Sequence, residues 1–320
     1  MKFKPIIIVA GEPRSIFFEI FFKSLKAERY KSPIILIASK KDFFHQKKKY
    51  KFNKMINLIN LSDKRLLKYS KTKKNLINVP LNDYSKYKKI SKKSKNYIEK
   101  CFEIALDLIN KKISNKLING PISKKYFLNK KFLGITEYLA KKTKTKKYAM
   151  LIYNEKLSVS PITTHLPLKL VTKKLNKNII KEKIMLIQKF YKIQFNFNPK
   201  IAVTCINPHC ESVGRVNEDD KVVLPIVKKL KKNKLKIFGP LSADTIFLKQ
   251  NRKNFDVILG MYHDQVLTPF KTLFEYDAIN ITLGLPFIRI SPDHGPNEKM
   301  FGKNRSNPQS LIKALKFLDY

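Results

Sequence analysis

The sequence predicts an α/β fold built around a largely parallel sheet, and two observations support this prediction. Short apolar, β-branched runs alternate with segments whose apolar residues recur at helical spacing, which is the pattern of successive βαβ units. Three of these runs lead directly into a histidine motif, as strands that open onto a site at the edge of a sheet would do. The 320 residues suffice for one large or two medium domains with a buried core.

The first half of the chain shows the alternation clearly. The apolar runs at residues 6–10 and 33–38 predict strands, and residues 16–25 predict the helix between them. Residues 94–112 predict a longer amphipathic helix, because apolar side chains recur there at helical spacing. A further strand is expected at residues 116–119, so this half contains consecutive strand–helix–strand units.

The second half continues the pattern. Strands are predicted at residues 158–163, 201–206, 235–238 and 257–261. Asn217 is a predicted N-cap, because the acidic residues that follow it favour the positive end of a helix dipole. The last helix is marked by Asn307 as its cap and by Pro308 at its first helical position.

The strongly basic composition does not predict a nucleic-acid-binding protein. The formal net charge is +43, yet only seven of the 67 basic residues are Arg, the side chain best suited to bidentate base contacts. The lysines are spread along the whole chain together with Asn, Ile and Phe, which indicates a compositional bias. We therefore expect no specific nucleic-acid partner.

Membrane and export signals are not expected either. No apolar run approaches the length of a transmembrane helix, so no membrane association is predicted. The apolar stretch near the N-terminus is short and leads into Gly11-Glu12-Pro13, which does not resemble a signal-peptide cleavage site. We therefore expect a cytoplasmic location. Cys101, Cys205 and Cys210 are too few for a disulfide framework and are expected to be reduced.

Three histidines are the clearest candidates for a functional site. His165, His209 and His263 each follow one of the apolar runs in the second half of the chain. Imidazole is the commonest side-chain ligand of catalytic divalent ions, and strand ends in an α/β sheet are where such ligands gather. We predict a shared metal site, although each histidine could also be an ordinary loop or core residue.

Other polar residues follow the same strands. Asp244 and Asp264 are candidates for proton transfer or for orienting a ligand histidine, and Asp244 could instead be a helix N-cap. Arg289 lies within an apolar run and requires an anionic partner, which could be a ligand or a protein carboxylate. The turn at His294 and Gly295 is a candidate for cofactor binding, although a His-Gly turn also ends strands in ordinary loops.

Several motifs together resemble one family of enzymes. In order along the chain they occupy residues 119–124, 136–140, 164–168, 207–209, 239–244, 261–265, 280–289 and 293–295. Their order and spacing are similar to those of the 4-hydroxythreonine-4-phosphate dehydrogenases, over nearly the whole chain and most strongly from residue 116 to 295. The resemblance implies the isocitrate/isopropylmalate dehydrogenase-like fold, with a cleft between two α/β domains, which we place at residues 1–130 plus 256–320 and at residues 131–255.

The resemblance also implies an activity. This is the oxidation of 4-phosphooxy-L-threonine with NAD or NADP to 2-amino-3-oxo-4-phosphooxybutanoate, which loses carbon dioxide to give 3-amino-2-oxopropyl phosphate for pyridoxine (vitamin B6) biosynthesis. The implied metal ligands, for a zinc, magnesium or cobalt ion, are His165, His209 and His263, shared across a homodimer interface. The implied substrate contacts are Thr136, Lys271, Asn280 and Arg289.

Three departures from the family pattern leave alternatives open. Ile135 stands where the family has a substrate-contacting histidine, residues 11–19 lack two of the family's glycines, and residues 296–298 differ after the 293–295 motif. One alternative is a sister dehydrogenase that acts on 4-phospho-threonate or 4-phospho-erythronate. The other is a non-catalytic polyanion-binding descendant of the fold, which the intact metal histidines argue against.

Overall fold

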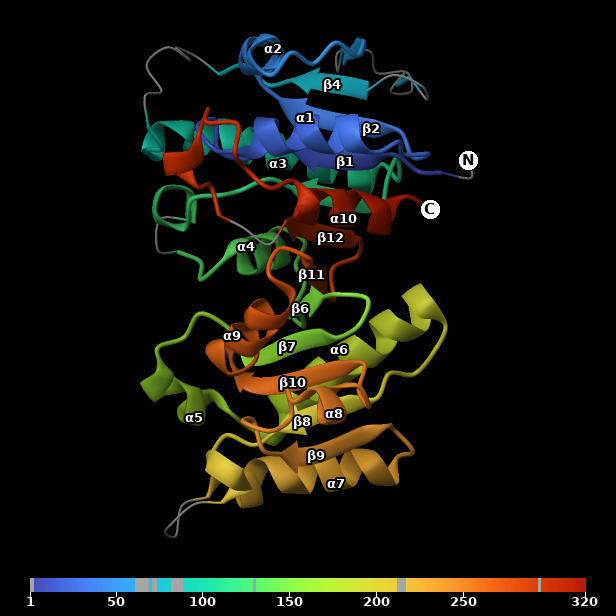
Figure 1. The fold of residues 1–320 in the computed structure, drawn as a ribbon, viewed down its shortest axis with the longest axis vertical. Coiled ribbons are helices and arrows are strands. Elements are labelled where there is room, and N and C mark those ends of the chain that lie inside the picture. The colour runs from blue at the N-terminus through green and yellow to red at the C-terminus, as the bar shows by residue number, and fades with distance from the viewer. Residues whose placement is uncertain are drawn as a thin grey trace. The chain divides into compact units, whose positions relative to one another are not determined.

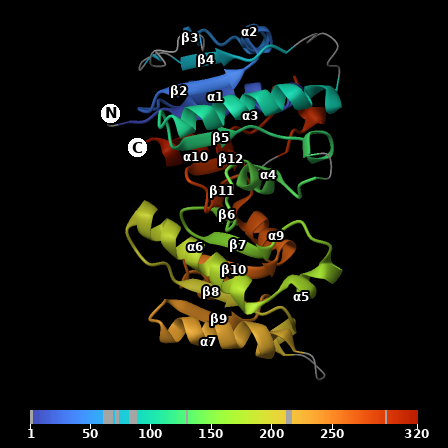
Figure 2. The same ribbon diagram turned by 180° about the vertical axis from the view of Figure 1, so that it is seen from behind.

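A computed structural model describes residues 3–60, 69–70, 74–81, 89–128, 131–211, 217–292 and 295–320 (Figures 1 and 2). The chain divides into two compact units, which we call unit 1 (Met1–Ile135 with Pro286–Tyr320) and unit 2 (Thr136–Leu285). The first unit is discontinuous, because the chain leaves it once and returns. The return lies at residue 286 and not at residue 256 as expected, because strands β10 and β11 pair with strands of unit 2.

Unit 1 is built on a parallel sheet. Its strands, in spatial order, are β3 (Ile56–Ile59), β4 (Lys74–Asn78), β2 (Ile34–Ala38), β1 (Ile6–Val9), β5 (Lys116–Asn119) and β12 (Ile288–Pro292). Its helices are α1 (Phe17–Ala27), α2 (Lys40–Lys49), α3 (Lys95–Asn110) and α10 (Gln309–Leu318), with short helical turns at Lys92–Ser94, Lys124–Leu128 and Glu298–Met300. Figure 1 shows α1 and α10 on the near face of this sheet, and Figure 2 shows α3 on the opposite face.

Unit 2 contains a mixed sheet. Its strands, in spatial order, are β11 (Ile279–Leu283), β6 (Ala149–Tyr153), β7 (Ser158–Thr163), β10 (Val257–Tyr262), β8 (Ile201–Thr204) and β9 (Ile237–Leu241). Its helices are α4 (Ile135–Lys142), α5 (Val171–Lys174), α6 (Lys177–Phe195), α7 (Leu224–Lys232), α8 (Lys249–Arg252) and α9 (His263–Phe274), with turns at Leu168–Leu170, Pro208–Cys210 and Asp219–Val223. Strands β7, β10, β8 and β9 are parallel, whereas β6 is antiparallel to both of its neighbours.

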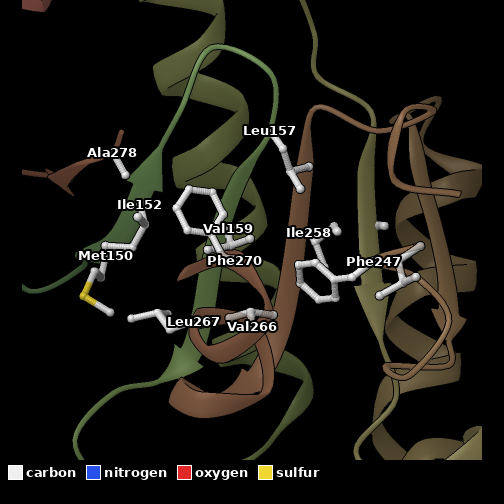
Figure 3. Packing of buried hydrophobic residues seen from close by; sticks show 12 residues of the cluster. Met150, Ile152, Leu157, Val159, Phe247, Ile258, Val266, Leu267, Phe270 and Ala278 are labelled. Carbon is white, nitrogen blue, oxygen red and sulfur yellow. The ribbon is translucent and has the colours of Figure 1, made fainter. Parts of the chain in front are cut away.

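A buried apolar cluster fixes helix α9 against the sheet of unit 2. Val266, Leu267 and Phe270 on α9 belong to one cluster with Val159 on β7 and Ile258 on β10 (Figure 3). Burying an aliphatic or aromatic side chain of this size contributes roughly 1.5–3 kcal/mol. The packing therefore fixes the helix that begins at His263.

The α/β class and most of the predicted elements are confirmed, with two local corrections. Strand β9 begins two residues later than expected and continues through Gly239-Pro240. It is the last strand in the spatial order, and an edge position tolerates a proline that lacks a backbone N–H. Helix α10 begins at Gln309, so Pro308 precedes the helix, while Asn307 Oδ1 still accepts a hydrogen bond from Gln309 N at 2.8 Å. Within the described part of the chain, no helix has the length and apolar character needed to span a membrane.

Candidate metal centre at the carboxyl edge of unit 2

The strand order of unit 2 places the three histidine motifs side by side. Strands β7, β10 and β8 are adjacent and parallel, although other elements separate them in the sequence. His165 follows β7, His263 follows β10 and His209 follows β8. Because the carboxyl ends of parallel strands lie at the same edge of a sheet, all three motifs belong to one edge.

Two of the three imidazoles are neighbours. The ring centroids of His165 and His263 lie 5.5 Å apart, with the ring planes inclined at 38°. His263 is the first residue of α9, and its Nδ1 lies 2.6 Å from Asp264 Oδ1. A carboxylate at this distance can hold the ring in one orientation and one tautomer.

The third histidine lies in an exposed turn. His209 has a left-handed backbone conformation, with φ of 54°, and its side chain is 72% exposed. Its Nδ1 lies 3.9 Å from Asp244 Oδ2. The pKa of Asp244 is lowered, first by a hydrogen bond from Ser242 Oγ at 2.6 Å and then by the nearby His209. Asp244 is not a helix N-cap, because the next helix begins at Lys249.

The three histidines fit a divalent ion in ligand type, although they are not gathered around one point. Among the residues that the structure describes, no group of three or more His, Cys, Asp or Glu side chains is close enough together to hold a metal ion. Three imidazoles on adjacent strand ends nevertheless fit the chemistry of zinc or cobalt, whereas magnesium prefers oxygen ligands. The histidines thus fit a metal in ligand type and in strand position, and two of them are already neighbours.

A buried carboxylate shapes the turn that carries His209. Asp219 Oδ1 accepts a hydrogen bond from Ile206 N at 2.8 Å, and its Oδ2 accepts from the backbone and side-chain nitrogens of Asn207, each at 3.0 Å. Asn217 caps the following turn as predicted, since its Oδ1 accepts from Asp219 N at 2.9 Å. The local sequence indicates for Asp219 only an interaction with the helix dipole, because nothing local links it to a turn twelve residues earlier.

The residues expected to contact substrate lie in both units. In unit 2, Thr136 Oγ1 lies 3.2 Å from Thr282 Oγ1, and Lys271 is half-buried on α9. The Oδ1 atom of Asn280 is buried and has no hydrogen-bond partner in the described part of the chain, which suits an atom that receives a ligand. In unit 1, Arg289 is fully buried on β12.

One hydrogen-bond partner of Arg289 is an amide. Its Nε donates to Asn119 Oδ1 at 2.7 Å, so this part of the guanidinium is held by a neutral side chain at the end of β5.

Of the two residues assigned to cofactor binding, Gly295 is exposed, and His294 lies outside the described residues. The three cysteines are free thiols, as expected.

Unit 1 has a polar residue at its own strand edge that is not among the site residues predicted from the sequence. Glu12 follows β1 and is 3% exposed. Its Oε2 accepts from Ser94 Oγ at 2.7 Å and its Oε1 from Ser123 N at 3.2 Å. Burial, with a smaller contribution from the charge of Glu298, raises the pKa of Glu12 to about 7 against the lowering effect of these hydrogen bonds.

Comparison with known proteins identifies the family. The family described as "Pyridoxal phosphate biosynthetic protein PdxA" matches residues 30–318. A relative from Sulfurihydrogenibium sp. (strain YO3AOP1), named 4-hydroxythreonine-4-phosphate dehydrogenase, is 38% identical over 97% of this chain and 96% of its own. A Pectobacterium atrosepticum relative, named D-threonate 4-phosphate dehydrogenase, is 32% identical over 75% of this chain and 76% of its own.

Solved structures agree with the sequence relatives. The crystal structure of 4-hydroxythreonine-4-phosphate dehydrogenase from Klebsiella pneumoniae has a TM-score of 0.82 and 28% identity, and the match covers 99% of this chain and 97% of that one. A terephthalate 1,2-cis-dihydrodiol dehydrogenase from Burkholderia xenovorans LB400, at 18% identity and a TM-score of 0.65, shares the fold. The chain belongs to the PdxA family, which confirms the family expected from the motifs.

Proposed function

We propose that this chain catalyses the NAD- or NADP-dependent oxidation of 4-phosphooxy-L-threonine. The 3-hydroxyl oxygen loses a proton and carbon 3 gives a hydride to the nicotinamide ring, which forms 2-amino-3-oxo-4-phosphooxybutanoate. This β-keto acid loses carbon dioxide and leaves 3-amino-2-oxopropyl phosphate. The observation that carries the proposal is the set of three histidines on adjacent parallel strand ends in a member of the PdxA family.

His165, His209 and His263 are the residues that would hold a divalent ion. When bound, such an ion polarises the hydroxyl of the substrate and lowers its pKa. In the tautomer that donates from Nδ1 of His263 to Asp264, the lone pair of Nε2 is left for a metal ion. Asp244 is placed to do the same for His209 once the two side chains approach more closely than 3.9 Å.

The substrate is an anion with a phosphate and a carboxylate. Arg289 and Lys271 supply positive charge for these groups, and Arg289 is already held by Asn119 in one orientation. Thr136 and Asn280 supply short polar groups for the amino acid portion, in keeping with the buried Oδ1 of Asn280 that lacks a protein partner among the described residues. Binding by these side chains orients carbon 3 for hydride transfer.

A second candidate substrate is 4-phospho-threonate, in which a hydroxyl replaces the amino group. Two observations favour it: the relative from Pectobacterium atrosepticum bears that activity in its name, and Ile135 cannot form the hydrogen bond expected at this position. Purified protein should therefore be assayed with 4-phosphooxy-L-threonine, 4-phospho-threonate and 4-phospho-erythronate, each with NAD and with NADP. Preferred turnover of the amino acid supports the first proposal, and preferred turnover of either phospho-acid replaces it.

We further propose that the enzyme is a homodimer whose two subunits contribute ligands to each metal site. Because His165 and His263 of one chain are neighbours, His209 is the ligand that the partner would supply, and a mixed dimer of His165→Ala and His209→Ala chains then has one site with all three histidines intact. Activity in the isolated mixed dimer, with none in either parent, supports shared sites. An inactive mixed dimer of verified composition shows that each site is built within one chain.

A further inference from the structure

One side chain at the carboxyl edge of unit 2 connects two of the strand ends that carry histidines. Gln265, in the first turn of α9, accepts at Oε1 from Met261 N at 2.7 Å and from Thr204 Oγ1 at 2.8 Å. Its Nε2 donates to the backbone oxygen of Cys205 at 2.7 Å. The amide thus bonds to the end of β10 and to the end of β8 at once.

These contacts are made with residues that precede the candidate metal ligands by a few positions in the chain. Met261 is two residues before His263, and Cys205 is four residues before His209. The backbone oxygen of Met261 also accepts from Thr163 Oγ1 at 2.8 Å, and Thr163 is two residues before His165. The hydrogen bonds of Thr163 and Gln265 therefore link all three strand ends in one chain of contacts.

A glycine leaves the space that the Gln265 side chain occupies. A Cβ atom on Gly260 would lie 2.4 Å from Val266 Cγ1 and 3.1 Å from Gln265 Oε1, so no larger residue fits beneath them. Val266 is part of the buried cluster, which fixes the turn of α9 that bears Gln265 (Figure 3). Helix packing and the glycine together hold the amide in its bridging position.

We propose that Gln265 is a positioning residue, which sets the separation between the strand ends that carry His209 and His263 and so tunes the affinity of the metal centre. The inference rests on the proposed function, since it presupposes that these histidines bind an ion. His209 stands in an exposed turn, so its position as a ligand depends on where β8 ends. Groups that orient metal ligands from behind typically alter metal affinity by about 10- to 100-fold when they are replaced.

The test uses three variants of the full chain. Gln265→Met keeps the length of the side chain and removes every hydrogen bond, whereas Gln265→Glu keeps the acceptor at Oε1 and replaces the donor to Cys205 by a second acceptor oxygen. Gln250→Met, at an exposed position on α8, is the matched control. Zinc affinity is measured by calorimetry, the ligand geometry by the visible spectrum of the cobalt-loaded protein, and stability by thermal unfolding without metal.

We expect Gln265→Met to weaken zinc binding by about 10- to 100-fold and to shift the cobalt spectrum, with a smaller effect for Gln265→Glu and none for Gln250→Met. If Gln265→Met fails to fold, Gln265→Glu carries the measurement. Wild-type zinc affinity in Gln265 variants that lose only thermal stability would show a purely structural role and overturn the inference. Absence of zinc binding by the wild-type chain would overturn the metal centre itself, which distinguishes the two failures.

Discussion

The two units place polar side chains at their strand edges in opposite ways. In unit 1, Glu12 after β1 is buried, and both of its oxygens are engaged by Ser94 and Ser123. In unit 2, the His263 side chain is 35% exposed and the His209 side chain 72% exposed, and their contacts are to the carboxylates of Asp264 and Asp244.

The polar group at the strand edge of unit 1 holds loops together, whereas the histidines at the strand edge of unit 2 are available to a ligand. Glu12 joins three segments of unit 1, and its acceptors are used within the protein. At the edge of unit 2 the linking role falls to Gln265 and Asp219, which bond to the backbone behind the histidines. These supporting hydrogen bonds do not use the imidazole nitrogens, which remain available to a ligand.

The largest expected effect concerns an exception to this comparison, because Arg289 is a buried charge in unit 1 that we assign to the substrate. We expect Arg289→Met to lower kcat/KM by about 100- to 1000-fold, since a buried charged contact is typically worth about 3–4 kcal/mol. The free energy of unfolding should change by no more than about 2 kcal/mol, because a long apolar side chain replaces the charge. Steady-state kinetics and urea unfolding measure the two quantities.

Arg252→Met is the matched control for this variant. Arg252 donates to the backbone oxygen of Phe247 at 2.7 Å and has no assigned role in the reaction, so kcat/KM should be unchanged. Normal kcat/KM in Arg289→Met together with a large loss of stability would make Arg289 a structural residue. The comparison would then hold for unit 1 without an exception.

The next effect is a pH dependence of stability that originates in Glu12. Its pKa is about 7 in the folded protein against 4.5 for an ordinary carboxyl, so the folded chain binds more protons than the unfolded chain between these values. The free energy of unfolding should therefore fall by roughly 3 kcal/mol as pH rises from 4.5 to 7, and then level off. Urea unfolding at a series of pH values follows this contribution.

Glu12→Gln should remove this contribution while it keeps the shape of the side chain. Glu103→Gln, at a position with a 55% exposed side chain on α3, should leave the pH profile of the wild type intact. Parallel profiles for the wild type and Glu12→Gln would show that Glu12 is not the titrating group. The contrast between a buried edge in unit 1 and an open edge in unit 2 would then lose its electrostatic support.

The smallest effect concerns substrate choice at the start of α4. Ile135→His restores a hydrogen-bonding side chain beside Thr136, and an unpaired polar group typically costs about 1–3 kcal/mol. We expect the ratio of kcat/KM for 4-phosphooxy-L-threonine to that for 4-phospho-threonate to rise by about 5- to 150-fold. Ile193→His, at an exposed position on α6, is the control. A ratio that stays flat would show that residue 135 does not determine selectivity.

Much of the fold could be predicted from local patterns in the sequence. The strands ahead of His165, His209 and His263 were predicted because apolar, β-branched runs mark buried strands without reference to the rest of the chain. The antiparallel pairing of β6 could not be predicted, since strand direction depends on the whole topology. The sequence likewise does not reveal that β7, β10 and β8 are neighbours, because their spatial order differs from their order along the chain.

The supporting residues of the site were missed for the same reason. Gln265 bonds to Thr204 and Cys205, about sixty residues away, and Asp219 bonds to a turn twelve residues earlier. A short polar motif shows that such residues are present but carries no information on their distant partners. The histidine ligands could be selected from residue type and strand position alone, whereas the groups that hold them required the structure.

The most direct test of the metal centre is the metal content of the protein. Wild-type chain, a His165→Ala/His209→Ala/His263→Ala variant and the control His45→Ala, at an exposed position on α2, are equilibrated with zinc, desalted and measured by mass spectrometry. We expect about one zinc per chain in the wild type and in His45→Ala, and none in the triple variant. Equal zinc in the triple variant and the wild type would contradict a metal centre at the carboxyl edge of unit 2.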